Sequence, residues 1–301
     1  MSTYRAFGLT FDSDIKLHPL LTSDEENADV KIELSQVCKT GLDNPRTVKP
    51  YCQIASNELW LQIPDIARFY VTNGNKIVVQ PEANADMQSV RLFLLGSCIG
   101  AIMYQRNRLV IHGNAIRFGD GCVIFAGASG NGKSTLAAAF YKRGYEILAD
   151  DLSVIDEFCQ VQPSYPQIKL WHDTAKKLDI DVSQLNRIRL QVDKYAYPIK
   201  DDFCDIPLPV KAIYILNTHN NNDFIFDPIK GLDKFNPLKN NSYRSNYIEG
   251  LGLKAAHLKL CGLLANNIDI IRITRPNTGF KLDELVELIE ADIKQREEKS
   301  V

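Results

Sequence analysis

The sequence predicts a mixed α/β (α+β) fold, and three observations lead to that prediction. Residues 1 to about 85 contain short runs in which polar and apolar residues alternate, the pattern of half-buried strands. A glycine-rich loop, Gly127–Thr135, then separates an apolar run from a helix-forming run. Further strand-like and helical runs follow. We therefore expect a mostly β N-terminal domain, residues 1–85, and an α/β domain, residues 86–301, organised around the loop.

The N-terminal region ends in a predicted hairpin and a predicted helix. Asn73-Gly74 joins two alternating runs and is typical of a hairpin turn. Asp86 is a suitable N-cap for a helix from Met87 to about Gln105. Because the second half of this helix is apolar on almost all sides, we expect it to be buried in the core. Its longest apolar run, Leu92–Tyr104, is too short to cross a bilayer.

The most informative feature of the chain fits the phosphate-binding pattern G-x-x-x-x-G-K-[ST], the Walker A motif. Its residues are Gly127, Ala128, Ser129, Gly130, Asn131, Gly132, Lys133, Ser134 and Thr135. The preceding run, Cys122–Ala126, predicts a buried strand. The following run, Leu136–Arg143, predicts a helix that Gly144 would cap. Strand, glycine-rich loop and helix are the context that the motif requires.

The motif has a specific chemistry. Glycines allow the loop to wrap with its backbone N–H groups pointing inward, where the helix N-terminus adds partial positive charge for phosphate oxygens. Lys133 adds a mobile charge for the β- and γ-phosphates, and the Ser134 hydroxyl can bind Mg²⁺. The alternative is a glycine-rich turn that binds nothing, but such a turn has no use for lysine and serine at these positions.

Two aspartates, Asp150 and Asp151, end the next predicted strand, Tyr145–Ala149. Their distance in sequence from Lys133 would allow this strand to lie beside the strand of the phosphate loop. One carboxylate would then reach the metal, directly or through water, and the other would lie near the hydroxyl of an acceptor. The residues alone do not say which aspartate does which. The alternative is a pair of aspartates that only caps a loop.

His112, in an apolar run before the loop, could reach the γ-phosphate or the second aspartate as a donor or proton relay. The alternative is a histidine satisfied within the core. The remaining histidines form no metal-ligand spacing; they are His18, His172, His219 and His257. A basic cluster, Arg187, Arg189, Lys194 and Lys200, and the separate Arg244 could bind a phosphate, although a solvated face is the default interpretation of both.

Beyond residue 160 the pattern is weaker. Pro209–Leu216 predicts a strand, Thr174–Leu178 the start of a helix, and Asn236–Asn246 an Asn-rich loop. The run 283–296 predicts an amphipathic helix whose apolar stripe packs in the core. The stripe consists of Leu285, Val286, Leu288, Ile289 and Ile293.

The composition excludes several classes of protein. The 301 residues are 45% hydrophobic and 24% charged, as in ordinary globular proteins, and a net charge of −2 provides no basic footprint for nucleic acid. The seven cysteines have no C-x-x-C spacing, and Cys98, Cys122 and Cys261 lie in apolar runs, so we expect reduced core residues. No signal-peptide pattern is present. We expect a cytoplasmic protein that binds neither nucleic acid nor membrane.

Three segments together resemble, in order and spacing, the catalytic domain of HPr kinase/phosphorylase. They are His112-Gly113, Gly127–Thr135 and Arg143–Asp151. That family has a histidine–glycine strand, a G-x-S-G-x-G-K-S loop and an arginine–glycine turn before a strand that ends in paired aspartates. The resemblance implies a phosphoenolpyruvate-carboxykinase-like P-loop fold and phosphorylation of a serine that depends on ATP and Mg²⁺. It also implies that Asp151 is the base, assisted by His112. Asp150 and Ser134 would lie near Mg²⁺.

The chain also departs from that family. A second signature, a glutamate–arginine–glycine stretch, has no counterpart in residues 160–260, so the resemblance does not extend to HPr as acceptor or to the reverse phosphorylase reaction. The layout of the whole chain is similar instead to a divergent branch found with lasso-peptide biosynthesis genes, in which the acceptor is the terminal serine of a precursor peptide. The segments that carry this likeness are Tyr4–Leu9, Tyr165–Trp171 and Pro207–Leu216.

We therefore expect an ATP- and Mg²⁺-dependent serine kinase whose partner is a precursor peptide or a small protein with a serine hydroxyl. One alternative is a kinase of another acceptor, either HPr or a small molecule with a hydroxyl. A second alternative is a nucleotide-binding regulator without catalysis, against which the intact set of Lys133, Ser134, Asp150, Asp151 and His112 argues. HPr kinases form hexamers, so a homo-oligomer is compatible with the resemblance, but the sequence does not determine the number of subunits.

Overall fold

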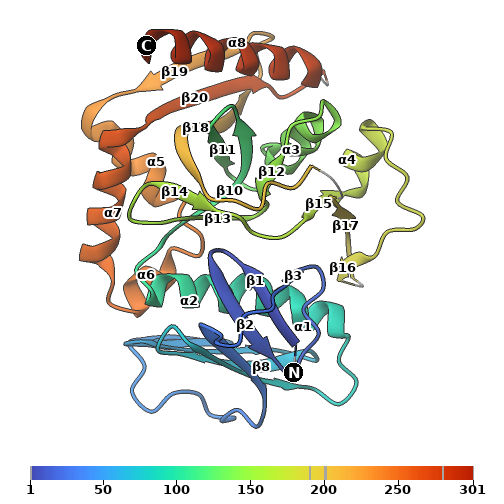
Figure 1. Ribbon diagram of the computed structural model, residues 1–301, viewed down its shortest axis with the longest axis vertical. Helices are drawn as coiled ribbons and strands as arrows, with labels where there is room; N and C mark the ends of the chain where they lie inside the picture. Colours follow the sequence, from blue (N-terminus) through green and yellow to red (C-terminus); the bar gives the residue numbers. More distant parts are fainter. Residues whose placement is uncertain (1, 190, 200–201, 280, 301) are drawn as a thin grey trace.

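The computed structural model describes residues 2–189, 191–199, 202–279 and 281–300 (Figure 1). Within these ranges the chain forms two large sheets, a small third sheet and helices, so the predicted mixed α/β fold is confirmed. The N-terminal sheet, blue in Figure 1, lies at one end of the molecule. The second large sheet and most of the helices lie above it in that view.

In the described part of the chain, nine strands form the N-terminal sheet in the order β3-β1-β2-β4-β9-β8-β7-β6-β5. They are β1 Ser2–Ala6, β2 Leu9–Ser13, β3 Leu21–Thr22, β4 Val30–Leu34, β5 Thr47–Lys49, β6 Cys52–Ala55, β7 Glu58–Ile63, β8 Ala67–Thr72 and β9 Lys76–Pro81. The predicted hairpin joins β8 and β9. Asn73 and Gly74 there have φ of 54° and 67°, the left-handed conformation that Asn and Gly accept most readily.

The predicted helix after the sheet is also present. It consists of α1 (Met87–Phe93), a π-helical turn η1 (Leu94–Cys98) and α2 (Ile99–Gln105). The Asp86 carboxylate accepts hydrogen bonds from the backbone N–H of Gln88 and Ser89, which confirms the N-cap. The whole helix is 19 residues long, enough by length and composition to cross a membrane, but 67% of its apolar stretch is buried inside the protein. It is a core helix, as its all-round apolar surface predicts.

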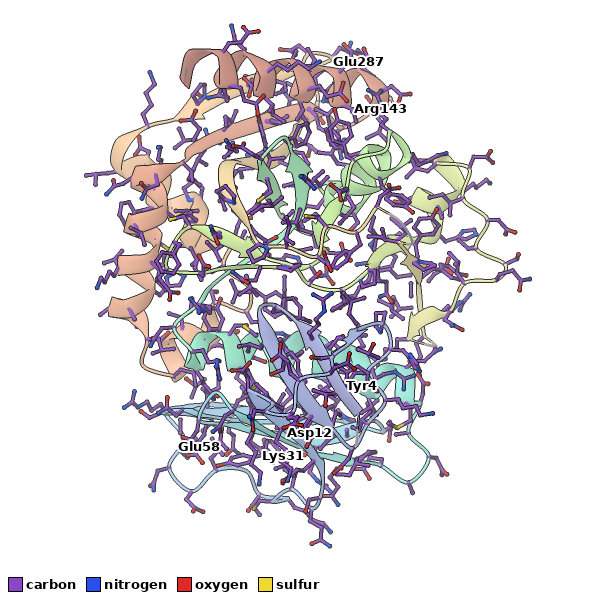
Figure 2. The ribbon with its side chains drawn as sticks, in the orientation of Figure 1. Tyr4, Asp12, Lys31, Glu58, Arg143 and Glu287 are labelled. Carbon is purple, nitrogen blue, oxygen red and sulfur yellow. The ribbon has the colours of Figure 1, made fainter. Side chains whose placement is uncertain are left out.

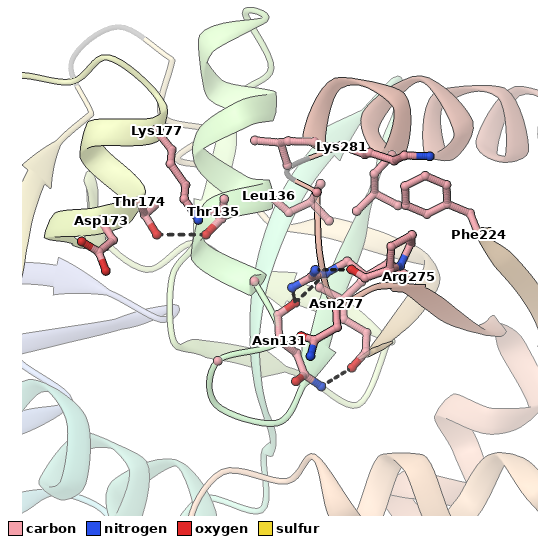
Figure 3. Close-up of a pocket in the computed structure, with 17 residues that line it drawn as sticks. Asn131, Thr135, Leu136, Asp173, Thr174, Lys177, Phe224, Arg275, Asn277 and Lys281 are labelled. Atoms are coloured by element: carbon pink, nitrogen blue, oxygen red, sulfur yellow. Dashed lines mark hydrogen bonds between the residues drawn. The ribbon is translucent and has the colours of Figure 1, made fainter. Parts of the chain in front are cut away.

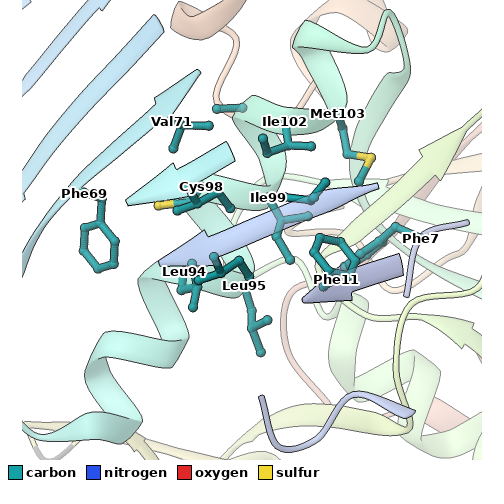
Figure 4. Close-up of a cluster of buried hydrophobic side chains, with 14 of the residues drawn as sticks. Phe7, Phe11, Phe69, Val71, Leu94, Leu95, Cys98, Ile99, Ile102 and Met103 are labelled. Carbon is teal, nitrogen blue, oxygen red and sulfur yellow. The ribbon is translucent and has the colours of Figure 1, made fainter. Parts of the chain in front are cut away.

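The core around this helix unites the two halves of the chain. Figure 4 shows apolar side chains of the N-terminal strands and of the β1–β2 turn packed with those of the helix; the labelled ones are Phe7, Phe11, Phe69, Val71, Leu94, Leu95, Cys98, Ile99, Ile102 and Met103. Val110 and Leu152, from strands of the second sheet, belong to the same cluster. Burial of each such aliphatic or aromatic side chain stabilises the fold by about 1.5–3 kcal/mol. The helix therefore packs against both large sheets.

The second sheet is built around β10 and β11. Its eight strands among the described residues are β10 Leu109–Phe118, β11 Gly121–Gly127, β12 Ile147–Ala149, β13 Leu152–Ile155, β14 Gln160–Gln162, β18 Leu208–His219, β19 Ile225–Ile229 and β20 Asp269–Pro276. The first half of β10 pairs with β13, and its second half pairs with β11 and β12. The parallel neighbours β18 and β20 follow on the other side of β11.

One expectation about this sheet is wrong. The strand that ends at the paired aspartates, β12, pairs with β10 and not with the phosphate-loop strand β11. The reason is topological, because β10 and β11 form an antiparallel hairpin that fills one edge of β11, while β18 fills the other. The aspartates still reach the same end of the sheet as the phosphate loop, because β11 and β12 are both antiparallel to β10 and therefore run in the same direction.

Helices cover both faces of this sheet. Alternate side chains of β11 point to opposite faces: Val123 and Phe125 pack with α3 (Lys133–Lys142) and α8 (Leu282–Ser300), while Ile124 packs with α7 (Lys254–Asn267). The predicted stripe of α8 is buried except for Leu288, which is 38% exposed because it lies on the outer side of the helix. Arg143, after α3, pairs with three acidic side chains of α8, including the Glu287 labelled in Figure 2.

The remaining elements are a small sheet and several short helices. A three-stranded sheet contains β15 (Gln167–Trp171), β16 (Arg187–Arg189) and β17 (Val192–Pro198), and α4 (His172–Lys177) follows β15. The predicted Asn-rich loop is partly wrong, because the 3₁₀ turn η2 (Gly231–Lys234) leads into α5 (Phe235–Asn240) within it. The last short helix, α6, spans Asn246–Gly250. Asparagines at 236, 240 and 241 are compatible with this helix and its C-cap.

A glycine fixes the distance between β10 and β11, which yields a first prediction. A Cβ at Gly113 would lie 2.7 Å from the carbonyl oxygen of Phe125, and this backbone atom cannot move without disturbing the sheet. We expect Gly113→Ala to lower the free energy of unfolding by about 1–3 kcal/mol, measured by urea denaturation.

Gly262→Ala is the matched control, because Gly262 lies inside α7 and a Cβ there would have a Phe235 ring carbon at 3.4 Å as its nearest neighbour. Alanine should leave the stability unchanged or raise it by up to about 1 kcal/mol. Equal effects of the two substitutions would contradict the steric explanation.

Candidate active site

The glycine-rich loop has the backbone conformation that its sequence predicts. β11 ends at Gly127 and α3 begins at Lys133. Gly127, Gly130 and Gly132 have φ of 144°, 89° and 96°, which are conformations that side chains disfavour. A Cβ at Gly127 would lie 2.6 Å from the carbonyl oxygen of Leu216 on β18. The loop is therefore packed directly against the neighbouring parallel strand at its start.

Lys133 lies within the loop. Its Nζ donates to the carbonyl oxygens of Gly127 and Ala128 at 2.7 and 3.2 Å, and the residue is only 8% exposed. Burial lowers the pKa of Lys133, and the negative charge of Asp151 partly offsets that effect. The Lys133 ammonium group is thus held at the centre of the loop, where a phosphate chain would lie.

Asn131 and Arg275 hold the outer side of the loop. Asn131 donates its side-chain amide to the carbonyl oxygen of Leu216 at 2.6 Å, and its own carbonyl oxygen accepts from the Arg275 guanidinium at 3.2 and 3.4 Å (Figure 3). Burial lowers the pKa of Arg275. Its guanidinium donates to backbone carbonyl oxygens, those of Asn131 and Pro276. The loop therefore has a second cation, Arg275, at Asn131.

A cavity of about 360 Å³ opens beside these residues (Figure 3). One wall is apolar, with Leu136, Leu285 and Phe224. The polar part of the lining includes Arg275, Asn277, Lys281 and the loop backbone from Gly130 to Gly132. A cavity with an apolar wall that continues into a phosphate loop has the mixed character of a nucleoside site.

Asp150 is a buried carboxylate. It is 2% exposed, its Oδ1 accepts from the Asn114 side-chain amide, and its Oδ2 accepts from the backbone N–H of Lys169 at 2.9 Å. Burial, with the neighbouring charge of Asp151, raises the pKa of Asp150 to about 6. Both oxygens are used within the protein, so Asp150 fixes the relative positions of β10, β12 and β15.

Asp151 is different although it is the next residue. It has φ of 68°, its side chain is 22% exposed, and its Oδ2 accepts from Lys169 Nζ at 2.6 Å. Burial alone would raise the pKa of Asp151, but the positive charges of Lys169 and Lys194 outweigh it and hold that pKa well below its usual range. The pair thus consists of one desolvated carboxylate and one that stays ionised and accessible.

His112 contacts the same residue through its ring. Its Nδ1 lies 3.0 Å from the backbone carbonyl oxygen of Asp151, and not against the carboxylate. A carbonyl oxygen only accepts, so Nδ1 carries the proton and Nε2 is the unprotonated nitrogen of the neutral ring. Burial, followed by the charge of Lys133, lowers the pKa of His112. The histidine therefore supports the positive-φ turn at Asp151.

Sequence reasoning missed Lys169 and Asn114, which hold the two aspartates. Lys169 is buried between Ile168 and Leu170, and a lysine in the middle of an apolar strand is a signal that could have identified it. The burial of Asp150 and Lys169 arises from strands far apart in sequence, which no local pattern reveals.

The described members of the predicted basic cluster have different partners. Lys194 lies with its Nζ 5.9 Å from the centroid of the Trp171 ring, and its charge reaches both aspartates. Arg187 pairs with Asp193 at 3.3 Å, and Arg189 lies over the ring of Phe93. Lys200 lies outside the described residues.

The residues fit a magnesium–nucleotide complex better than a metal bound by protein alone. Across the described ranges, no three His, Cys, Asp or Glu side chains are grouped to hold a metal ion. Ser134 lies in the first turn of α3, where a hydroxyl could reach a metal bridged to phosphates. Asp150 has both oxygens engaged, so it could reach such a metal only through water.

A second cavity, of about 630 Å³, lies on the other side of the loop and is lined by Gly127, Ala128, Ser129, His112 and the turn Ser242–Arg244. This turn is fixed to the sheet. Tyr243 N–H donates to the carbonyl oxygen of Val110 at 2.9 Å, and the Tyr104 hydroxyl donates to the carbonyl oxygen of Tyr243 at 2.6 Å. The ring of Tyr243 lies 5.8 Å from that of His112, centroid to centroid.

No family model matches this chain, and no curated protein matches it. Among solved structures it aligns with the Hpr(Ser) kinase/phosphatase from Coxiella burnetii at 16% sequence identity and a TM-score of 0.31. The alignment covers 64% of this chain and 92% of the other. This is a distant likeness, and the function proposed below rests on the residues of the site.

A buried histidine behind the turn Ser242–Arg244 yields a pH prediction. The Ser242 hydroxyl donates to the carbonyl oxygen of Leu238, so it must accept from His257 Nε2 at 2.8 Å. Burial lowers the pKa of His257 below the ordinary value of about 6.5. A depressed histidine pKa contributes stability that is present above the unfolded-state pKa and is lost as pH falls through the folded-state pKa.

We expect wild-type protein to lose more unfolding free energy than His257→Gln between about pH 7.5 and about pH 5.5, by up to about 1.4 kcal/mol per pH unit. The measurement is urea denaturation at both pH values. His172→Gln, at an exposed position, is the control and should behave as wild type. Identical losses in wild type and His257→Gln would contradict the assignment.

Proposed function

We propose that this protein is an ATP- and Mg²⁺-dependent kinase that transfers the γ-phosphoryl group to a serine hydroxyl of a peptide. The observation that carries the proposal is the position of Asp151, a partly exposed carboxylate whose backbone carbonyl is hydrogen-bonded to His112, because His112 lines one cavity together with the start of the phosphate-binding loop. A loop that only binds nucleotide does not require such a carboxylate, whereas phosphoryl transfer to a hydroxyl does.

The nucleotide would lie across the loop with its phosphates in contact with the backbone N–H groups and Lys133 Nζ. The cavity of about 360 Å³ would take the nucleoside, with its base against Leu136 and Phe224. Arg275, which donates to the Asn131 carbonyl oxygen, would keep the loop in shape and place a second positive charge near the phosphates. This division follows from the apolar and polar walls of that cavity.

Ser134 would hold Mg²⁺ together with the phosphate oxygens, and Asp150 would act through water. When bound, the ion neutralises charge on the phosphates that develops during transfer. The chain's own contribution is positional. Asn114 and the Lys169 N–H fix Asp150, which fixes the end of β12 next to the loop.

Asp151 would orient the acceptor. The serine oxygen attacks the γ-phosphorus, the bond from that phosphorus to the bridging oxygen of ADP breaks, and the serine proton passes to the Asp151 carboxylate. Because the pKa of Asp151 is lowered, the group remains ionised at neutral pH and acts mainly by holding the hydroxyl in line with the phosphate. His112 supports the backbone at this position through its bond to the Asp151 carbonyl.

The acceptor peptide itself is proposed from the resemblance of the whole chain to the branch found with lasso-peptide biosynthesis genes. That likeness favours the terminal serine of a lasso-peptide precursor. HPr and small molecules with a hydroxyl are the competing acceptors, and a regulator without catalysis is the competing function.

Lys133→Ala should abolish both nucleotide binding and transfer, because it removes the charge at the centre of the loop. Binding is measured by isothermal titration with ATP and Mg²⁺, and transfer by mass spectrometry of the acceptor. Lys254→Ala, which removes a lysine paired with Glu249 at the surface, is the control and should have no effect. Wild-type nucleotide affinity in Lys133→Ala would refute the role of the loop.

Asp151→Asn should leave nucleotide binding nearly intact while lowering turnover by about 10² or more, the scale expected for a lost catalytic carboxylate. The asparagine oxygen can still accept from Lys169, so the fold should survive, and retained ATP affinity verifies this. Asp120→Asn, at an exposed turn, is the control. Normal turnover in Asp151→Asn would eliminate this residue as the base.

The proposal as a whole is tested by intact-mass spectrometry of candidate acceptors incubated with the protein, ATP and Mg²⁺. The acceptors are a precursor peptide with a C-terminal serine, the same peptide with alanine there, and HPr. Phosphate on the serine-ended peptide alone supports the peptide-kinase function. Phosphate on HPr would assign the competing acceptor. ATP binding without transfer to any acceptor would favour a small-molecule kinase or a regulator.

A further inference from the structure

The cavity of about 630 Å³ beside the loop is cationic and amide-rich. Its lining includes Arg244 and Arg272, and its amide side chains come from Asn217, Asn236, Asn240 and Asn241. Among the described residues that line it, none is Asp or Glu. This composition favours an anionic ligand, because an arginine offers paired N–H donors and amides add neutral ones.

The two arginines of this cavity differ in their partners. Arg272 pairs with Asp227 at 2.9 Å, so its charge is largely compensated. Arg244 is exposed and lies over the rings of Tyr243 and Tyr247, at 5.5 and 5.9 Å from their centroids. Its Nε donates to the Tyr243 hydroxyl at 3.3 Å, and within the described parts of the chain no carboxylate forms an ion pair with it. Arg244 is therefore the uncompensated cation of the cavity.

The backbone at Arg244 is held in a costly conformation. Its φ is 44°, which costs a residue other than glycine about 1–2 kcal/mol. The surrounding bonds impose it: Tyr243 N–H donates to the carbonyl oxygen of Val110, and Tyr247 N–H donates to that of Arg244 at 2.8 Å. A strained turn that aims an unpaired arginine into a cavity fits a binding role better than a structural one.

Arg244 lies on the acceptor side of the site. The ring of Tyr243 lies near both His112 and the Arg244 guanidinium, at 5.8 Å from the His112 ring and 5.5 Å from Arg244 Cζ, measured to the Tyr243 centroid. His112 in turn bonds to Asp151. Arg244 therefore lines the same cavity as His112, which places its guanidinium near the groups that would face the acceptor.

We propose that Arg244 binds a carboxylate of the acceptor, and so selects peptides that carry a carboxylate near the reacting serine. This inference rests on the proposed kinase function. A carboxylate suits the planar guanidinium fork, which can donate two parallel hydrogen bonds to it, while the neighbouring tyrosine rings limit the movement of the fork. Two sources share this chemistry: the C-terminal carboxylate of a peptide that ends in serine, and an acidic side chain next to an internal serine.

The experiment uses pools of synthetic peptides that are random except around a single serine. In one arm the serine is the last residue, and its C-terminus is either free or amidated. In the other arm the serine is internal, the C-terminus is amidated, and either glutamate or glutamine follows the serine. Phosphate incorporation with ATP and Mg²⁺ is measured by mass spectrometry for the full chain and for Arg244→Gln, Arg244→Lys and Arg272→Gln.

We expect wild type to phosphorylate the carboxylate form of one arm about tenfold to a hundredfold more efficiently than its neutral form. The arm that shows the preference identifies the source. Arg244→Gln should abolish the preference, Arg244→Lys should retain part of it, and Arg272→Gln should retain it fully. The KM for ATP should not change in any variant, and Arg244→Lys keeps the test valid if Arg244→Gln does not fold.

Equal phosphorylation of charged and neutral pools, or a preference that survives Arg244→Gln, would overturn the inference. So would an equal loss for charged and neutral pools in Arg244→Gln, because the guanidinium would then act on the phosphoryl group. If no pool is phosphorylated, the proposed kinase function is refuted. The binding of carboxylate peptides by Arg244 is then tested separately, by measuring which of the same pools the protein retains on ultrafiltration. Selective retention of carboxylate peptides by wild type but not Arg244→Gln would support it, and any other pattern would refute it.

Discussion

The contact between Lys169 and the two aspartates is the interaction on which the rest of the site depends. The Lys169 ammonium pairs with Asp151, and its backbone N–H donates to Asp150, so one residue of β15 determines the position of both carboxylates. Burial would lower the pKa of Lys169, but the negative charges of Asp151 and its neighbours keep that pKa well above its ordinary value. The buried Lys169 charge is thus compensated by Asp151, whereas Asp150 is held by neutral donors. A substitution of Asp151 that removed its acceptor oxygen would leave the ammonium group without a partner in a low-dielectric environment.

This contact gives two chemically identical residues, Asp150 and Asp151, different environments. Asp150 has its oxygens closed off by Asn114 and by the backbone, and burial raises its pKa to about 6. Asp151 faces a buried ammonium and remains ionised with part of its surface open. Environment and not sequence therefore assigns different roles to adjacent carboxylates, as in other sites where paired acids have divergent pKa values. Asp150 holds the strands together, and Asp151 is available to a hydroxyl.

Strand β10 connects these features. Three successive residues of the strand have different functions. The ring of His112 hydrogen-bonds to the backbone of Asp151, and the side-chain amide of Asn114 donates to Asp150. Gly113, between them, has no side chain and so allows β11 to approach closely. The same strand accepts the N–H of Tyr243 at Val110, so it also positions the turn that carries Arg244. The cavity of about 630 Å³ thus depends on this strand, and the buried helix Met87–Gln105 packs against it.

By itself the sequence determined the local elements: the glycine-rich loop with its positive φ angles, the Asp86 cap, the Asn73-Gly74 hairpin and the buried character of β11. Each depends on steric or hydrogen-bonding preferences of residues a few positions apart, which the sequence displays directly. Only the tertiary structure decided that β10 lies between the loop strand and the aspartates, that Lys169 compensates Asp151, and that Arg244 has no acidic partner among the described residues. These facts depend on strand order and on desolvation by distant segments, and the energies of buried charges follow from that packing and not from neighbours in the chain.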